Sequence, residues 1–247
     1  MSSAPYVLRY ADENELAGEV SKHLVNTLAQ AQAERGAAHL CLCGGRAERM
    51  VCGHLASLAR SGSINPAGLH LWWSSEAFVT TADPSRNSLA TLGVLGGALA
   101  VPPANIHAMP SSNGSADPDD AAYIYAKELG ETVFDICLLE LGLGGRVASI
   151  FPRHPSFTMQ SSLNLLAIGV TDAPEGPPEQ ITLTYNAINR SRHIWGLASG
   201  AAIAGCLADT LRGDPRTPAA QVRGTDQTIW FVDRASAEQV PYFQCDL

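Results

Sequence analysis

The chain has 247 residues, of which 46% are hydrophobic and 16% are charged. This is enough apolar sequence for one substantial core, so we expect a single domain over residues 1–247, without long solvated helices or disordered charged tails. The formal net charge of −8 provides no basic surface and argues against a nucleic-acid partner.

Apolar periodicity and turn residues predict strands that alternate with helices along the whole chain. Asp12 is a good N-cap for the first helix. The expected strands cover residues 6–10, 39–43, 69–73, 105–109, 134–139, 165–170, 180–184, 194–198 and 229–232. The expected helices cover residues 13–35, 47–60, a segment from about 88, 120–129 and 200–211.

This alternation is typical of an α/β protein whose mostly parallel sheet carries helices on both faces. Polar loops are expected over residues 74–87 and 111–120. Residues 214–225 form another loop, which we expect to be able to close over a neighbouring surface. No internal repeat and no linker divides the chain.

The N-terminus has no basic segment followed by an apolar run, and the longest apolar stretch, residues 92–101, is interrupted by three glycines. We therefore expect neither a secretory signal nor a membrane span, and predict a cytoplasmic protein with no membrane partner.

Disulfides among the six cysteines are not expected in a cytoplasmic protein. Cys41 and Cys43 alternate in a strand and should share one face as small buried groups. No second cysteine or histidine pair suggests a metal site.

Two glycine pairs fall at the carboxyl ends of predicted strands, where open parallel sheets bind ligands. They are Gly44-Gly45, followed by Arg46, and Gly144-Gly145, followed by Arg146. Glycine allows a ligand to approach the backbone, and a following helix offers unpaired N–H groups to an anion. Neither pair matches a dinucleotide-binding or P-loop motif. Either pair by itself is also compatible with a tight strand-to-helix turn that binds nothing.

The combined motifs resemble the 6-phosphogluconolactonase family over residues 5–235. Residues 134–152, FDICLLELGLGGRVASIFP, are similar to the family signature F-D-x-x-L-L-G-M-G-x-D-G-H-x-A-S-L-F-P. Residues 71–79, LWWSSEAFV, resemble its W-x-D-E-R-x-V segment, and residues 199–204, SGAAIA, resemble S-G-A-A-K-A. Residues 170–184, VTDAPEGPPEQITLT, are similar to V-x-D-S-P-K-P-P-P-x-R-I-T-L-T, and residues 83–87 and 105–110 match two further segments.

The resemblance implies a modified Rossmann-like fold shared with glucosamine-6-phosphate deaminases and ribose-5-phosphate isomerases. It also implies hydrolysis of 6-phospho-glucono-1,5-lactone to 6-phosphogluconate in the oxidative pentose phosphate pathway, with no metal and no cofactor. The ASIFP ending at residues 148–152 favours the lactonase branch over the deaminase branch. The expected partner is a small molecule, a sugar phosphate or another anion. The oligomeric state is left open, a monomer included.

Several polar residues of the family motifs are replaced in this chain. The motif His falls on Arg146 and the motif Asp on Gly144. Of the Asp, Glu and Arg in the W-x-D-E-R segment, only the Glu is retained, as Glu76. At the other replaced positions this chain has Ser75 and Ala77 in place of the Asp and Arg of that segment, Ile203 in place of the Lys of S-G-A-A-K-A, and Gln180 in place of the Arg before I-T-L-T.

Hydrolysis of a δ-lactone requires a base that activates water and a group that stabilises the oxyanion. In the family the motif His is the base, and the nearby Arg and Lys hold the 6-phosphate. Arg146 cannot accept a proton at neutral pH, although it could stabilise an oxyanion. Glu76 is the remaining candidate base, with a purely structural carboxylate as the alternative. We therefore expect the activity to be weak or lost.

Because lysine occurs only at positions 22 and 127, an anion site in the C-terminal half would depend on Arg, backbone N–H groups or protonated His. Arg46 and Arg146 suggest a re-formed anion site facing one cleft. Alternatively, each arginine faces solvent or pairs with a local acid such as Glu48. The predicted substrate-binding positions are Gly44, Gly45, Arg46, Ser75, Asn87, Gly144 and Gly145. Asn87 is expected either to bond a sugar hydroxyl or to cap the following helix.

Three functional hypotheses follow from these residues. The first is an active lactonase, supported by the order of the motifs and opposed by the replaced side chains. The second is a catalytically silent paralogue that binds a sugar phosphate or regulates a partner protein. The third, a sugar-phosphate isomerase or deaminase, ranks lowest because that chemistry also needs the missing Asp and His.

Overall fold

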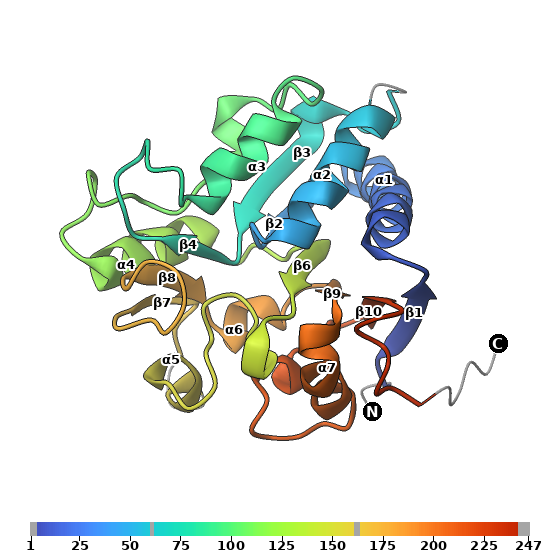
Figure 1. The fold of residues 1–247 in the computed structure, drawn as a ribbon. Helices are drawn as coiled ribbons and strands as arrows, with labels where there is room; N and C mark the ends of the chain where they lie inside the picture. Colours follow the sequence, from blue (N-terminus) through green and yellow to red (C-terminus); the bar gives the residue numbers. More distant parts are fainter. Residues whose placement is uncertain (1–3, 60–61, 161–163, 242–247) are drawn as a thin grey trace.

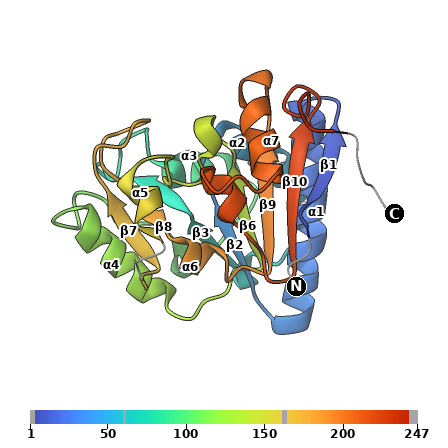
Figure 2. The ribbon, with the colours of Figure 1, turned by 90° about the horizontal axis from the view of Figure 1, so that it is seen from below.

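The computed structural model describes residues 4–59, 62–160 and 164–241. Its centre is a seven-stranded sheet with the order β1-β10-β9-β6-β2-β3-β5, in which every neighbouring pair is parallel (Figure 1). The first and last strands of the chain lie side by side at one edge (Figure 2). These strands are β1 (Tyr6–Tyr10), β2 (Ala38–Leu42), β3 (Leu69–Trp73), β5 (Ile106–His107), β6 (Ile136–Glu140), β9 (His193–Ala198) and β10 (Gln227–Asp233).

Helices cover both faces of this sheet and enclose two apolar cores. One core joins the sheet to α1 (Glu13–Arg35), α2 (Arg46–Ala59) and α3 (Asn87–Leu95). The other joins it to α4 (Pro118–Leu129) and α7 (Ala204–Leu211). The predicted α/β class, with a mostly parallel sheet between helices, is confirmed.

A second, antiparallel sheet lies beside α4 and has the order β4-β8-β7 (Figure 1). Its strands are β4 (Ser75–Ala77), β8 (Gln180–Leu183) and β7 (Ala167–Val170). The sequence predicts β7 and β8 but treats β4 as part of a polar loop. Pairing with a segment about a hundred residues later forms this strand, and no local pattern signals such pairing.

Most predicted elements agree with the structure to within two residues, and Asp12 accepts the N-cap bond from the Glu15 N–H. The helix predicted over residues 200–211 is divided, because the turn Ala201–Ile203 precedes α7. The strand predicted over residues 105–109 contains only Ile106–His107. Two short helices, α5 (Pro155–Thr158) and α6 (Tyr185–Ile188), were not predicted. The predicted end of the second helix, Arg60, lies outside the described residues.

The five cysteines in the described part of the chain are free thiols, and Cys245 lies outside it. Cys41 and Cys43 contribute to different cores, so the expectation of one shared face is wrong. The reason is that β2 ends at Leu42 and Cys43 already belongs to the turn. Within the described ranges, no helix combines the length and apolar character needed to cross a membrane.

Three histidines on neighbouring strands form a ladder next to Trp72. The His39 and His70 rings stack with centroids 4.5 Å apart, and the Trp72 and His107 rings stack at 3.8 Å. The Trp72 indole N–H donates to His39 Nδ1 at 3.1 Å, and His107 Nδ1 lies 2.6 Å from a Glu128 carboxylate oxygen. Burial lowers the pKa of His39 from 6.5 to about 4, and the neighbouring His70 adds to the effect.

This ladder predicts a loss of stability in mild acid. Between pH 6.5 and about 4 the unfolded chain binds a proton at His39 that the folded chain does not bind, so the free energy of unfolding falls as the pH falls. Allowing for the partial exposure of the ring, we expect a loss of about 1–2 kcal/mol. Urea unfolding at both ends of this window, on wild type and His39→Gln, measures it. An equal loss in both proteins would contradict the assignment to His39.

Candidate functional site

The predicted site residues come from segments at one edge of the large sheet. Strands β6, β2 and β3 are parallel neighbours, so their carboxyl ends meet at the same edge (Figure 1). The segments that follow them contain Gly44-Gly45, Ser75-Glu76 of strand β4, and Gly144-Gly145. The fold therefore gathers the three predicted segments at the edge where open α/β sheets bind ligands.

The first glycine turn encloses the buried carboxylate of Glu48. One Glu48 oxygen accepts the backbone N–H groups of Cys43 and Gly44, the latter at 2.7 Å, and the other accepts the Thr91 hydroxyl at 3.1 Å. Burial raises the pKa of the Glu48 carboxyl, and these bonds oppose the rise. Two of the N–H groups that the sequence offers to an anion are thus already bonded.

A second carboxylate, that of Glu140 at the end of β6, lies on the N-terminus of α2. Its Oε2 accepts the backbone N–H of Ala47 at 3.0 Å and that of Glu48 at 3.4 Å. Burial raises the pKa of Glu140, and repulsion from Glu48 adds to the rise, whereas the backbone bonds and Arg146 oppose it. Sequence reasoning missed Glu140, although the family signature has Gly at this position.

Gly44 and Gly45 are required by close approaches of side chains. Gly44 has a φ of +77°, and a Cβ on it would lie 2.2 Å from Cγ of Asn87. A Cβ on Gly45 would lie 1.9 Å from Oε2 of Glu140. The space that glycine leaves open in this turn is filled by the chain itself.

Glu76 is 1% exposed and closes the N-terminus of α3. Its Oε1 accepts the N–H groups of Ala77 at 3.1 Å and Asn87 at 2.5 Å, and its Oε2 accepts the N–H of Ser88 at 2.9 Å. The Arg86 guanidinium lies 3.5 Å from Oε2. These contacts favour the structural alternative for Glu76. The role of candidate base stays a prediction.

Asn87 and Ser75 are joined to each other. The Asn87 side-chain amide donates to the Ser75 carbonyl oxygen at 2.9 Å and packs over Gly44. The capping bonds of α3 come from Glu76, so Asn87 does not cap its own helix through its side chain. Ser75 is 5% exposed.

Arg146 is held at the rim of this edge. Its Nε donates to a Glu175 carboxylate oxygen at 3.0 Å and its Nη1 to the Ala148 carbonyl at 2.9 Å. Gln180 fixes the loop that carries Glu175, because its amide donates to the carbonyl oxygens of Glu175 and Pro177 at 2.7 and 2.8 Å. The guanidinium is therefore oriented by the segment that replaces the family's P-K-P-P-P run.

Arg46 points elsewhere. Its side chain is 67% exposed and pairs with Glu13 at the start of α1, with 2.6 Å between nitrogen and oxygen. Both arginines thus have a local acid as partner, although the acid is not Glu48 for either of them. A shared anion site between Arg46 and Arg146 remains a prediction, and these pairs favour its alternative.

The second glycine pair is tightly packed. Gly144 and Gly145 have φ values of +64° and +81°. A Cβ on Gly144 would lie 2.7 Å from Cγ of Pro152, and one on Gly145 would lie 2.2 Å from Cγ2 of Thr217. Thr217 belongs to the loop of residues 214–225, so this loop rests on the second glycine turn. Ile203, at the position of the family Lys, is 7% exposed and belongs to an apolar core.

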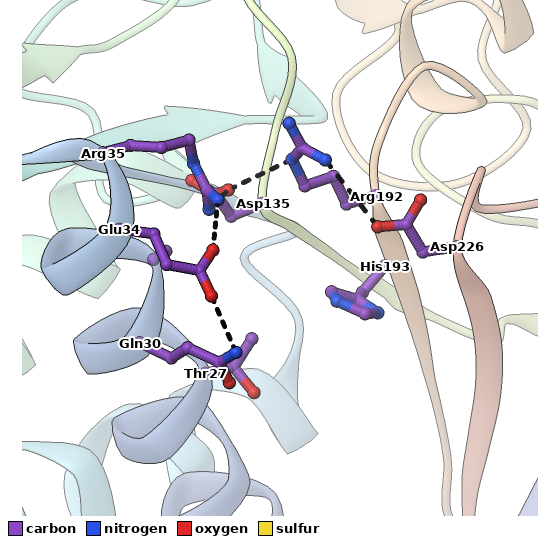
Figure 3. A pocket seen from close by; sticks show the side chains of 9 residues that line it. Thr27, Gln30, Glu34, Arg35, Asp135, Arg192, His193 and Asp226 are labelled. Carbon is purple, nitrogen blue, oxygen red and sulfur yellow. Dashed lines mark hydrogen bonds and ion pairs between the residues drawn. The ribbon is translucent and has the colours of Figure 1, made fainter.

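A cavity of about 160 Å³ lies at the opposite edge of the sheet (Figure 3). Three of the residues that line it, Asp135, Arg192 and Asp226, directly precede the strands β6, β9 and β10. Asp135 accepts from the Arg35 guanidinium at 2.6 Å and from the His39 N–H at 2.8 Å. Because this is the amino edge, and its charges pair with one another, we regard the cavity as structural.

Among the described residues, no group of three or more His, Cys, Asp and Glu side chains is arranged to hold a metal ion. The carboxylates at the carboxyl edge are instead bonded to backbone N–H groups. The arrangement offers the oriented guanidinium of Arg146 at the rim, while Arg49 is bonded to the Gly44 carbonyl oxygen and Arg86 lies beside Glu76. Three carboxylates are already engaged: Glu48, Glu76 and Glu140.

Comparison with known proteins relates the whole chain to one family. Residues 11–230 match the family described as glucosamine-6-phosphate isomerases/6-phosphogluconolactonase. The chain is 34% identical to a 6-phosphogluconolactonase of Streptomyces coelicolor, with 98% of this chain and 97% of the relative aligned. It is 32% identical to a 6-phosphogluconolactonase of Mycobacterium tuberculosis, with 94% of this chain and 97% of the relative aligned.

Solved structures share the fold. A 6-phosphogluconolactonase from Thermotoga maritima superposes with a TM-score of 0.80 at 24% identity, covering 93% of this chain and all of the other. A monomeric glucosamine-6-phosphate deaminase superposes with a TM-score of 0.76 at 19% identity, covering 95% of this chain and 99% of the other.

Proposed function

We propose that this chain, which belongs to the glucosamine-6-phosphate isomerase/6-phosphogluconolactonase family, catalyses the family's lactone hydrolysis only weakly. The reaction would be the hydrolysis of 6-phospho-glucono-1,5-lactone to 6-phosphogluconate, a step of the oxidative pentose phosphate pathway. The lactonase relatives of more than 30% identity support this reaction class.

The proposal rests chiefly on Arg146, at the position of the signature His. In the reaction, water adds to the lactone carbonyl, the ring C–O bond breaks, and a proton moves from the water to the departing ring oxygen. A guanidinium cannot accept that proton, but it can stabilise the oxyanion that precedes ring opening. Glu175 and the Ala148 carbonyl orient Arg146 at the rim of the sheet edge, which suits this electrostatic role.

The neighbouring carboxylates are poorly placed to replace the base. Glu76 accepts three backbone N–H groups and lies beside Arg86, contacts that would be weakened if it took up a proton. Glu48 accepts two backbone N–H groups and a hydroxyl in a fully buried position. The remaining catalysis would therefore be electrostatic.

Hydrolysis of the phosphorylated lactone, measured above its spontaneous rate at several protein concentrations, tests this proposal. We expect a kcat/KM about 10²–10⁴-fold below that of the Streptomyces coelicolor relative, because that is the usual contribution of a positioned base. Equal values for the two proteins would overturn the proposal. A rate that does not increase with protein concentration would favour the catalytically silent alternative.

A further inference from the structure

The N-terminus of α2 has the geometry that proteins use for phosphate. It follows a strand of a parallel sheet through a glycine turn, its first N–H groups have no partner within the helix, and the helix dipole favours negative charge there. In this chain an anion is already present at this position. Oε2 of Glu140 lies 3.0 Å from the N of Ala47 and 3.4 Å from the N of Glu48.

The turn and the carboxylate fit one another. Any side chain at position 45 would collide with Glu140, since a Cβ there would be 1.9 Å from Oε2. Oε2 of Glu48 accepts the N–H groups of Cys43 and Gly44 in the same turn. Two carboxylates of the chain thus bind four backbone donors around one glycine turn.

The carboxylates at the turn oppose a second anion, and the arginines near it already have partners within the chain. A phosphate brought to α2 would meet the negative charges of Glu48 and Glu140, which already repel one another. Arg46 is 67% exposed and bonded to Glu13 on α1, and Arg49 donates to the Gly44 carbonyl oxygen of the turn at 2.8 Å. Arg146 is bonded to Glu175. A phosphate would gain no free helix donor from Ala47 or Glu48 and would face like charges.

We infer that Glu140 is a specificity-determining residue that acts as a built-in anion at the N-terminus of α2 and keeps a ligand's phosphate out. The inference rests on the lactone chemistry of the proposed function but goes beyond it, because it assigns to the same edge a ligand class that lacks the phosphate. That class is a polyhydroxylated lactone or sugar acid without a phosphate group.

Calorimetric titration with 6-phosphogluconate and with gluconate, two ligands that differ in the phosphate, tests this inference. We expect wild type to bind both with affinities within about threefold of each other, and Glu140→Gly to bind 6-phosphogluconate at least about tenfold more tightly than gluconate, as regained charge-assisted bonds allow. Glu140→Gln removes the charge but retains the volume and an acceptor oxygen at the helix N–H groups, so it should gain less preference for 6-phosphogluconate than Glu140→Gly. Glu34→Gln removes the same charge at the opposite edge of the sheet and should keep the wild-type pattern.

The amide NMR signals of Ala47 and Glu48 locate the binding. They should shift with 6-phosphogluconate in Glu140→Gly and stay unchanged in wild type. If Glu140→Gly does not fold, Glu140→Ala replaces it. A wild-type preference for 6-phosphogluconate above about tenfold, with shifts at Ala47 and Glu48, would overturn the inference, and so would a folded Glu140→Gly without any gain. These titrations measure no turnover, so their failure leaves the hydrolysis result intact, and the reverse is also true.

Discussion

Replacing Arg146 by His is expected to raise the rate of lactone hydrolysis by about 10²-fold in kcat/KM, the lower end of what a positioned base contributes. An imidazole near neutral pH can take the proton that a guanidinium cannot take. We expect the lower end because the signature Asp is also absent. Gly144 replaces it, with a φ of +64° and Pro152 packed against it.

Arg146→Gln is the matched control, since it removes the positive charge without adding a base. Both variants lose the bond to Glu175 and the one to the Ala148 carbonyl oxygen, so a difference between them reports proton transfer. Initial rates on the same lactone, corrected for spontaneous opening, measure the effect. If Arg146→His hydrolyses the lactone no faster than Arg146→Gln, the absence of a base does not limit the rate of hydrolysis by this protein.

Glu76→Ala is expected to lower the free energy of unfolding by about 3–5 kcal/mol, the usual result of breaking a buried ion pair. The substitution leaves the N–H groups of Ala77, Asn87 and Ser88 without this acceptor. It also leaves Arg86, which is 4% exposed, with only the Met109 carbonyl among the described bonds of its guanidinium. Urea or guanidinium unfolding with a global fit of the m-value measures the change.

Glu175→Ala provides the comparison for an exposed pair. The Glu175 side chain is 43% exposed, so its loss should cost no more than about 1 kcal/mol. A Glu76→Ala protein that keeps wild-type stability but loses hydrolytic activity would instead establish Glu76 as the base that the sequence suggests.

The sequence predicts the structural features that depend on residues close together in the chain. The helix of residues 13–35 has its cap, its apolar stripe and its terminal glycine in one continuous segment, and the structure confirms it. The glycine turns at the ends of β2 and β6 are also local features. Their position at one edge of the sheet follows from the parallel strands that precede them.

The chemistry of that edge depends on contacts between distant segments. The Glu140 carboxylate accepts the N–H of Ala47, 93 residues earlier, and residues 75–77 form β4 by pairing with residues 180–182. In the sequence alone Glu140 is one polar residue at the end of an apolar strand. Its replacement of the signature Gly is the signal that points to the filled turn.

Glu76 is a second residue whose role cannot be predicted from its position in the sequence. A retained acidic residue in a catalytic segment suggests a base, yet the side chain turns toward the N-terminus of α3 and is buried there. The direction of the backbone at Ser75–Ala77 decides whether the Glu76 carboxylate contacts a ligand or the N-terminus of α3. That direction is set by pairing with β8.

The dependence of hydrolysis on pH tests most directly whether this protein lacks a positioned proton acceptor. We predict that the protein-dependent rate, where it exceeds the spontaneous rate, rises in proportion to hydroxide from about pH 5.5 to 8, without the plateau that a titrating base produces. A rate that levels off above a single ionisation between about pH 6 and 7, the range of a histidine side chain, would contradict the account.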